Sequence, residues 1–177
     1  MSSLRALLSD ADSRLLQTLV LRRRPAADTT MRLVTRLGDV LVVGPLTLGL
    51  ALGAVPSLRA QGALALWTVA ASHLIVQLMK RRVCRSRPQL PVGLTFLIEP
   101  EDRFSFPSGH AAAGLSVALP IAVGLDGVLG PLVLAIGLSV GVSRCYLGVH
   151  YPGDVLAGWC LAILAFVIAP LVGGGLF

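Results

Sequence analysis

Three short polar motifs interrupt an otherwise apolar chain, and together they carry the residue types that transfer a phosphoryl group. The motifs are KRRVCRSRP at residues 80–88, PSGH at residues 107–110 and SRCYLGVHYPGD at residues 143–154. They contain the cations Lys80, Arg87 and Arg144, and the two arginines offer planar forks that match phosphate oxygens. We therefore examine these motifs as parts of one anion site.

His110 and His150 supply the reactive groups that such a site needs. One histidine can attack phosphorus while the other protonates the leaving oxygen. Asp154 lies four residues after His150, close enough to hold its ring in one tautomer. Ser108 and Gly109 stand at the start of an expected helix, where free backbone N–H groups and the helix dipole favour an anion. Because the cations already neutralise a phosphate, this chemistry requires no metal ion.

The elements that must position these motifs are membrane helices. Of the 177 residues, 55% are hydrophobic and 14% are charged, far less charge than a soluble domain carries. Several apolar stretches approach the roughly 20 residues that cross a bilayer. We predict an all-α, polytopic transmembrane helical bundle that forms a single domain over residues 1–177. The five predicted spans are residues 37–55, 61–79, 106–124, 131–142 extended toward Leu147, and 155–172.

The N-terminal segment differs from these spans. Residues 4–21 have leucines at helical spacing, but Asp10, Asp12 and Arg14 lie among them. This pattern favours an amphipathic helix at the membrane interface over a first span.

Five crossings in this order place residues 22–36, 80–104 and 143–154 on one side of the membrane. With the N-terminal segment on the same side, all of the 15 basic residues except Arg59 belong to that side. The positive-inside rule predicts that this side, and the site on it, face the cytoplasm. We attribute the sequence pI near 10.2 to topology signals and lipid headgroups, and expect no nucleic-acid partner.

The motifs K-x6-RP, PSGH and SR-x5-H-x3-D, in this order, resemble the three-part signature of the type 2 phosphatidic acid phosphatase superfamily, which also contains bacterial acid phosphatases and vanadium haloperoxidases. The signature covers residues 80–154. The resemblance implies that His150 forms a phosphohistidine, that Asp154 orients His150, and that His110 protonates the leaving oxygen. The residues it implies for holding the phosphate are Lys80, Arg87, Arg144, Ser108 and Gly109. The family is metal-independent, so no metal and no other cofactor is expected.

The sequence thus predicts an integral membrane phosphatase, in a bacterial inner membrane, that hydrolyses the terminal phosphate of a lipid phosphate or diphosphate. A polyprenyl (di)phosphate is the first expectation. Phosphatidylglycerophosphate, phosphatidate and prenyl-linked sugar phosphates suit the same pocket. A non-catalytic lipid-phosphate binding or transport protein and a haloperoxidase are the competing classes, but no signature histidine or aspartate is lost. The oligomeric state is not predicted.

Other polar residues near the motifs receive simpler interpretations. We interpret Arg81, Arg82 and Arg85 as interface anchors. For the acids Glu99, Glu101 and Asp102 we expect a solvated loop face, with a gate over the basic pocket as the alternative. His73 lies within the second span with Gln77 one helical turn later. A functional role and a hydrogen-bonded packing role are equally consistent with that position, and His73 is left out of the site.

Overall fold

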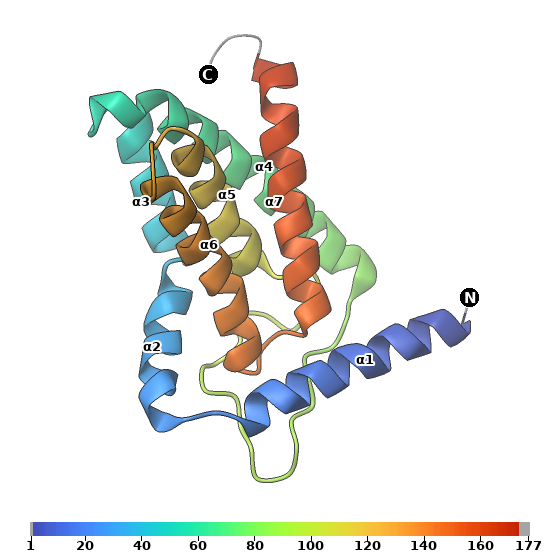
Figure 1. The fold of residues 1–177 in the computed structure, drawn as a ribbon. Helices are drawn as coiled ribbons and strands as arrows, with labels where there is room; N and C mark the ends of the chain where they lie inside the picture. The colour runs from blue at the N-terminus through green and yellow to red at the C-terminus, as the bar shows by residue number, and fades with distance from the viewer. Residues whose placement is uncertain (1, 174–177) are drawn as a thin grey trace.

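The computed structural model describes residues 2–173, with side chains described for residues 10–171, and over this range the chain is all-helical (Figure 1). The helices are α1 Ser2–Leu21, α2 Pro25–Arg36, α3 Val40–Ala51, the 3₁₀ helix η1 Pro56–Leu58, α4 Arg59–Val83, α5 Gly109–Val123, α6 Leu129–Tyr146 and α7 Pro152–Gly173. The predicted all-α bundle is confirmed. The ends of the predicted domain, residues 1 and 174–177, lie outside the described part of the chain.

The predicted spans correspond to helices of three kinds. Three described segments are long and apolar enough to cross a membrane, namely Pro56–Val83, Leu129–Tyr146 and Pro152–Leu171. Helices α2 and α3 pass the same test as a pair, but they bend by 49° at the break between them. Helix α5 has only 15 residues, because Pro107 and the N-cap residue Ser108 delay its start to Gly109.

Helix α2 differs from the sequence prediction, which expected residues 22–36 to connect elements without naming a helix. Pro25 occupies the first helical turn, where its missing N–H costs nothing. Asp28 in the first turn and Arg36 in the last turn complement the helix dipole. The break that follows α2 carries Asp39 toward the interior of the bundle.

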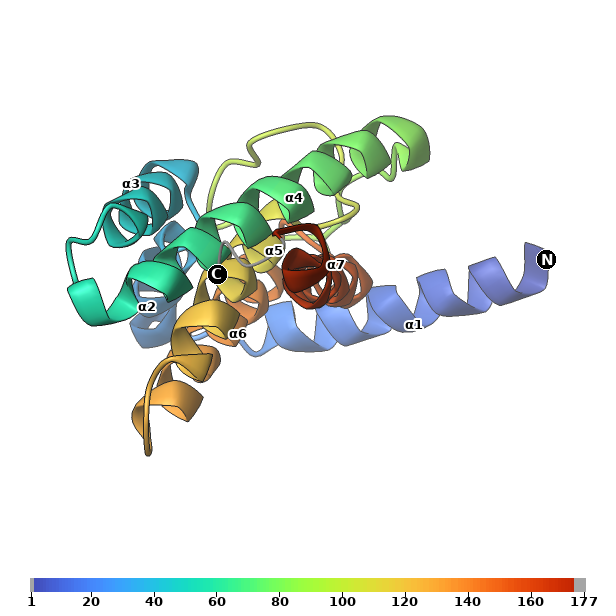
Figure 2. The same ribbon diagram turned by 90° about the horizontal axis from the view of Figure 1, so that it is seen from above.

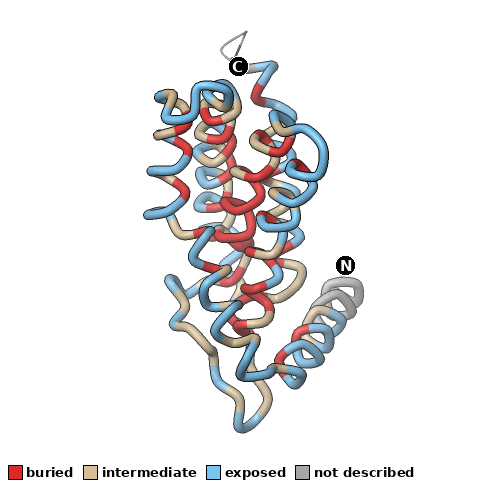
Figure 3. Tube along the Cα trace, turned by 60° about the vertical axis from the view of Figure 1, so that its left-hand side comes forward, coloured by how far each residue is buried: buried red, intermediate tan, exposed pale blue. Residues whose placement is uncertain are grey.

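Helix α5 is the central helix and packs against α4, α6 and α7. Its small residues are buried, and a buried core runs through the middle of the bundle (Figure 3). A Cβ atom on Gly114 would come within 3.0 Å of the carbonyl oxygen of Gly137 on α6. The two helices therefore approach each other so closely that only glycine fits at this crossing.

Helix α1 lies across one end of the bundle (Figures 1 and 2). Leu16 and Val20 are buried in a cluster with residues of α5, α6 and α7, whereas Leu15 and Leu21 are exposed. The structure confirms the predicted helix, and its position at a membrane interface stays a prediction. The same end of the bundle receives the end of α4, the start of α5 and the connection between α6 and α7, which carry the three polar motifs.

Candidate active site

His150 lies in the short connection between α6 and α7 and is only 2% exposed. Arg87 Nη1 donates a hydrogen bond to His150 Nε2 at 2.9 Å. Because a guanidinium only donates, Nε2 must be the accepting nitrogen, and the proton of the neutral ring is on Nδ1. The lone pair of Nε2 therefore faces a cation that is predicted to bind phosphate.

The electrostatic surroundings of His150 keep its ring neutral. Burial lowers its pKa well below the ordinary value, and the positive charges of Arg144, Arg87 and Lys80 lower it further. A neutral imidazole at pH 7 is the form that a histidine nucleophile requires.

Asp154 is completely buried in the first turn of α7. Its Oδ2 lies 3.5 Å from His150 Nδ1 and accepts a hydrogen bond from the backbone N–H of Tyr151 at 2.9 Å. His150 Nδ1 is buried and makes no well-aligned hydrogen bond within the described part of the chain, although the Ser105 backbone lies close enough to raise the His150 pKa slightly against the larger lowering. The structure thus brings the predicted pair together but leaves the hydrogen bond open, and a closure of about half an ångström would form it.

Arg85 holds Asp154 from the other side. Its Nη1 donates to Asp154 Oδ1 at 2.7 Å, and its Nη2 donates to Asp12 Oδ2 on α1 at 2.7 Å. The guanidinium also lies 4.0 Å from the centre of the Tyr151 ring. The interpretation of Arg85 as an interface anchor is therefore wrong, because this side chain connects α1 to the carboxylate beside His150.

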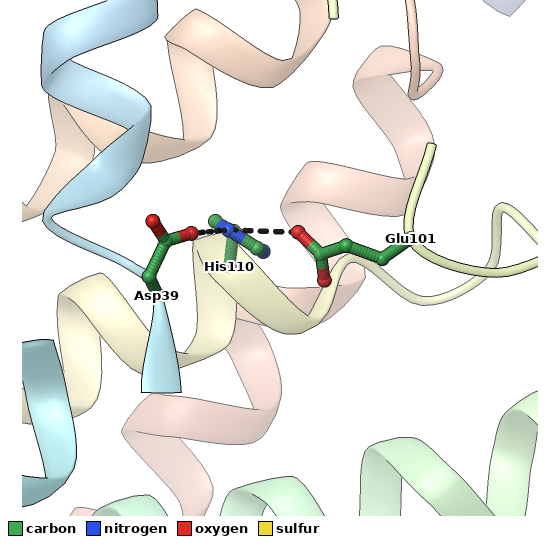
Figure 4. A group of neighbouring side chains, drawn as sticks. All are labelled: Asp39, Glu101 and His110. Atoms are coloured by element: carbon green, nitrogen blue, oxygen red, sulfur yellow. Dashed lines mark hydrogen bonds and ion pairs between the residues drawn. The ribbon is translucent and has the colours of Figure 1, made fainter. Parts of the chain in front are cut away.

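His110, the second residue of α5, is held by two carboxylates (Figure 4). Its Nε2 lies 2.7 Å from Asp39 Oδ1 and 3.1 Å from Glu101 Oε1. Since carboxylates only accept, Nε2 carries a proton, and with Nδ1 also protonated the ring is the imidazolium that a general acid needs. Asp39 was not expected in the site from the sequence. Its only signal there is a lone acid at the edge of an apolar stretch.

The same three residues are the one group within the described residues whose ligand atoms lie close enough, within 4.8 Å, to hold a metal ion. The two distances from His110 Nε2 to the carboxylate oxygens are short enough for direct contact without a metal ion between the groups. Arg144 Nη2 lies 3.6 Å from Glu101 Oε1 and supplies positive charge at this point. We therefore interpret the group as a proton-handling network around His110.

Glu101 and Asp102 occupy the space between the cations. Asp102 Oδ2 forms an ion pair with Lys80, and Asp102 Oδ1 accepts from Arg87 Nη2 at 2.9 Å. Burial raises the pKa of Asp102, but the hydrogen bond and charge of Lys80 outweigh burial and hold that pKa below its ordinary value. Each of the three predicted phosphate-binding cations thus contacts a loop carboxylate. Both acids are exposed, as the solvated-loop interpretation expects, but each also contacts a cation, so the alternative of a gate stays a prediction.

The remaining predicted phosphate contacts form the start of α5. Ser108 is fully buried, and its Oγ caps the helix by accepting from the Ala111 N–H at 3.4 Å. The Ser108 N–H donates to the backbone oxygen of Asp154 at 2.9 Å, which ties the starts of α5 and α7 together. Gly109 lines the cavity described next, so the predicted anion seat and the cations share one space.

A cavity of about 940 Å³ extends from the signature residues along the bundle. Lys80, Arg87, Arg144 and both histidines line its polar end. Apolar side chains of α3 and α4 line most of the rest, among them Leu41, Val43, Val69 and Leu74. A cationic head end that continues into an apolar channel matches the two parts of a lipid phosphate.

Comparisons with known proteins agree with this geometry. The PAP2 superfamily model matches residues 61–174. Decaprenylphosphoryl-5-phosphoribose phosphatase of Mycobacterium tuberculosis (strain CDC 1551 / Oshkosh) is 35% identical over 156 residues, which cover 86% of this chain and 84% of that protein. Phosphatidylglycerophosphatase B of Bacillus subtilis (strain 168) is 31% identical over 172 residues, 91% of this chain and 82% of that protein. The crystal structure of a transmembrane PAP2-type phosphatidylglycerolphosphate phosphatase from Bacillus subtilis superimposes with a TM-score of 0.76 at 27% identity, covering 95% of this chain and 87% of that one.

Proposed function

Since the chain belongs to the PAP2 superfamily and is an integral membrane lipid phosphatase, we propose that it cleaves a lipid phosphate with His150 as the nucleophile. The observation that carries this assignment is the 2.9 Å contact between Arg87 Nη1 and His150 Nε2. It places the attacking atom beside a cation that binds phosphate oxygens. A phosphate entering the polar end of the cavity takes the place of the two loop carboxylates.

In the first half of the reaction, the lone pair of His150 Nε2 attacks phosphorus. The bond between phosphorus and the lipid-side oxygen breaks, and His110, acting as the doubly protonated imidazolium, gives its Nε2 proton to that oxygen and becomes a neutral ring. The dephosphorylated lipid leaves, and the phosphoryl group remains on His150. Lys80, Arg87 and Arg144 stabilise the charge on the phosphoryl oxygens throughout.

In the second half, water attacks the phosphohistidine. His110, now deprotonated, accepts a proton from the water, and the N–P bond breaks with its electrons returning to His150 Nε2. Inorganic phosphate leaves, and both histidines regain their starting states. Asp154 stabilises the Nδ1–H of His150 while the ring carries the phosphoryl group.

For the substrate we propose a polyprenyl-linked phosphate. The supporting observation is the likeness to the Mycobacterium tuberculosis phosphatase, whose name specifies a decaprenyl-linked ribose phosphate and which the chain matches over most of its length. Phosphatidylglycerophosphate is the second candidate, favoured by the likeness to phosphatidylglycerophosphatase B.

A panel of lipid phosphates tests the proposal. Wild type and His150→Ala, purified in detergent, are assayed for phosphate release from prenyl monophosphate, prenyl diphosphate, prenyl-linked ribose phosphate, phosphatidylglycerophosphate and phosphatidate. We expect His150→Ala to lose about 10³-fold or more in kcat. Acid-labile labelled phosphate is expected on the wild-type protein alone. Equal phosphate release by the two proteins would refute the phosphohistidine mechanism.

We further propose that the site opens to the cytoplasmic side of the bacterial inner membrane, on the grounds of the charge distribution alone. Val92→Cys tests this, because Val92 is fully exposed in the loop between α4 and α5. In a background that lacks Cys84, Cys145 and Cys160, an impermeant maleimide should label it only in permeabilised cells. Asp126→Cys, in the exposed connection between α5 and α6, should show the opposite pattern. Labelling of Val92→Cys in intact cells would contradict the cytoplasmic orientation of the site.

A further inference from the structure

Two polar side chains line the cavity beyond its cationic end. Lys80, Gln77 and His73 follow one another on the same face of α4 and all three line the cavity. With a rise of 1.5 Å per residue, Gln77 lies about 4.5 Å and His73 about 10 Å along the helix axis from Lys80. The neighbouring cavity residues on α4 are Val69, Ala70 and Leu74, so this polar pair interrupts an apolar wall.

The pair is not satisfied by the rest of the protein. The Gln77 amide nitrogen lies 3.1 Å from His73 Nε2, and within the described residues neither side chain has another hydrogen-bond partner. Both side chains are exposed in the isolated chain instead of packed in the core. A polar pair within a membrane helix is costly, and cavity-lining polar residues at such depth mark substrate pathways. A packing role does not account for this exposure.

The hydrogen bond between the two residues defines what they offer to a ligand. The amide nitrogen only donates, so His73 Nε2 accepts, and the ring presents its Nδ1–H as a donor. The Gln77 Oε1 remains as an acceptor. One donor beside one acceptor complements a hydroxyl group, which both donates and accepts. The second phosphate of a diphosphate only accepts hydrogen bonds, so cations would bind it better than this pair does.

We propose that His73 and Gln77 form a subsite for hydroxyl groups in the part of the substrate between the scissile phosphate and the lipid tail. The subsite lies one to two helical turns from the cations, which is where a sugar or glycerol linker sits when the terminal phosphate is bound. The pair therefore favours lipids with a hydroxylated linker over simple prenyl phosphates. This inference rests on the proposed function, because it takes the cationic end as the seat of the scissile phosphate.

The test measures kcat/KM for His73→Leu and Gln77→Leu on matched substrates. Prenyl-linked ribose phosphate and phosphatidylglycerophosphate carry a hydroxylated linker, whereas prenyl monophosphate and prenyl diphosphate do not. Loss of one hydrogen bond should lower kcat/KM about tenfold for the linker substrates and leave the other two unchanged. Leu78→Ala is the control, because Leu78 is exposed on the same helix but does not line the cavity.

The outcomes separate the two proposals. Loss with the ribose substrate alone, or with the glycerol substrate alone, supports the subsite and identifies which linker it reads. An equal loss with all four substrates, or no loss with any, overturns the subsite while the phosphatase assignment stands. Absence of phosphate release by the wild type from every lipid overturns the proposed function itself.

Discussion

Arg85 donates to Asp154 at 2.7 Å and, with its other terminal nitrogen, to Asp12 at the same distance. One guanidinium therefore joins helix α1 to the buried carboxylate next to His150. Arg85 does not line the cavity, so we expect any effect of Arg85 on the reaction to act through Asp154.

Replacing Arg85 should damage both stability and turnover. Arg85→Met leaves Asp154 buried without its cation, which should cost about 3 kcal/mol of unfolding free energy. We expect kcat to fall roughly 10- to 100-fold, as when the partner of a ligating residue is removed, with KM changed little. Thermal unfolding and steady-state kinetics in detergent measure the two effects. Arg81→Met, at an exposed position in the last turn of α4, is the control. An unchanged kcat in Arg85→Met would contradict the positioning role.

Asp39→Asn should impair protonation of the leaving group. The substitution removes the negative charge that holds the Nε2–H of His110 at 2.7 Å. We expect kcat to fall about tenfold with a lipid phosphate, whose alcohol needs a proton to leave. The loss should be much smaller with p-nitrophenyl phosphate, whose leaving group needs none. Asp39→Glu should recover part of the activity. A loss of equal size with both substrates would show that Asp39 acts only on the structure.

Asp102→Asn should improve phosphate binding. Asp102 competes with phosphate for Lys80 and Arg87, and the amide removes that competitor but retains an oxygen for the Phe104 N–H. The inhibition constant of inorganic phosphate should fall about fivefold, in line with partly exposed ion pairs. Glu99→Gln, an exposed acid of the same loop, is the control. Weaker inhibition of Asp102→Asn would mean that the carboxylate helps to organise the site.

The His150 ring should resist protonation below neutral pH. Its pKa is lowered by burial and by neighbouring cations, so the folded protein binds this proton only well below pH 6.5, whereas the unfolded chain binds it near pH 6.5. Stability linked to His150 is therefore complete above pH 6.5 and declines as the pH falls toward the folded pKa. Nitrogen NMR of the three histidines, assigned with His150→Ala, measures the titration. A His150 midpoint at or above 6.5 would contradict this account.

Gly137→Ala should destabilise the bundle. An added Cβ would lie 2.9 Å from the Gly114 carbonyl oxygen and would also collide with Ala118. We expect a loss of about 2 kcal/mol, typical of overpacking, measured by thermal unfolding. Gly44→Ala is the matched control, because no atom lies within 4 Å of its added Cβ and alanine favours the helix. Equal stability of the two variants would show that α5 and α6 are not packed as tightly as the structure indicates.

The grouping of the signature residues was predictable because the proposed chemistry restricts their types and spacing. His150 and Asp154 are one helical turn apart, and His110 follows a serine cap at the start of an apolar stretch, so both features are visible along the chain. The polar ends of apolar stretches likewise indicated which segments meet at one end of the bundle.

The residues that contact the signature residues from other helices were not predictable, because only the tertiary structure brings them to the site. Asp12 and Asp39 are single acids without a spacing pattern, and only the position of α1 and the bend between α2 and α3 bring them to Arg85 and His110. The contacts of Asp102 were not predictable either, because this exposed loop folds back onto the cations.

The contacts that the segment before residue 61 makes with the site, some of them at the bend between α2 and α3, restrict how the chain can be engineered. Asp12, Thr35 and Asp39 all precede residue 61, where the family match begins, yet they contact Arg85, Arg144 and His110 respectively. The first sixty residues therefore cannot be replaced by an unrelated membrane segment without losing contacts to the site. A chimera could join residues 61–177 to another N-terminal segment and would keep every signature residue. It would lose Asp12, Thr35 and Asp39, the partners that hold Arg85, Arg144 and His110 in place.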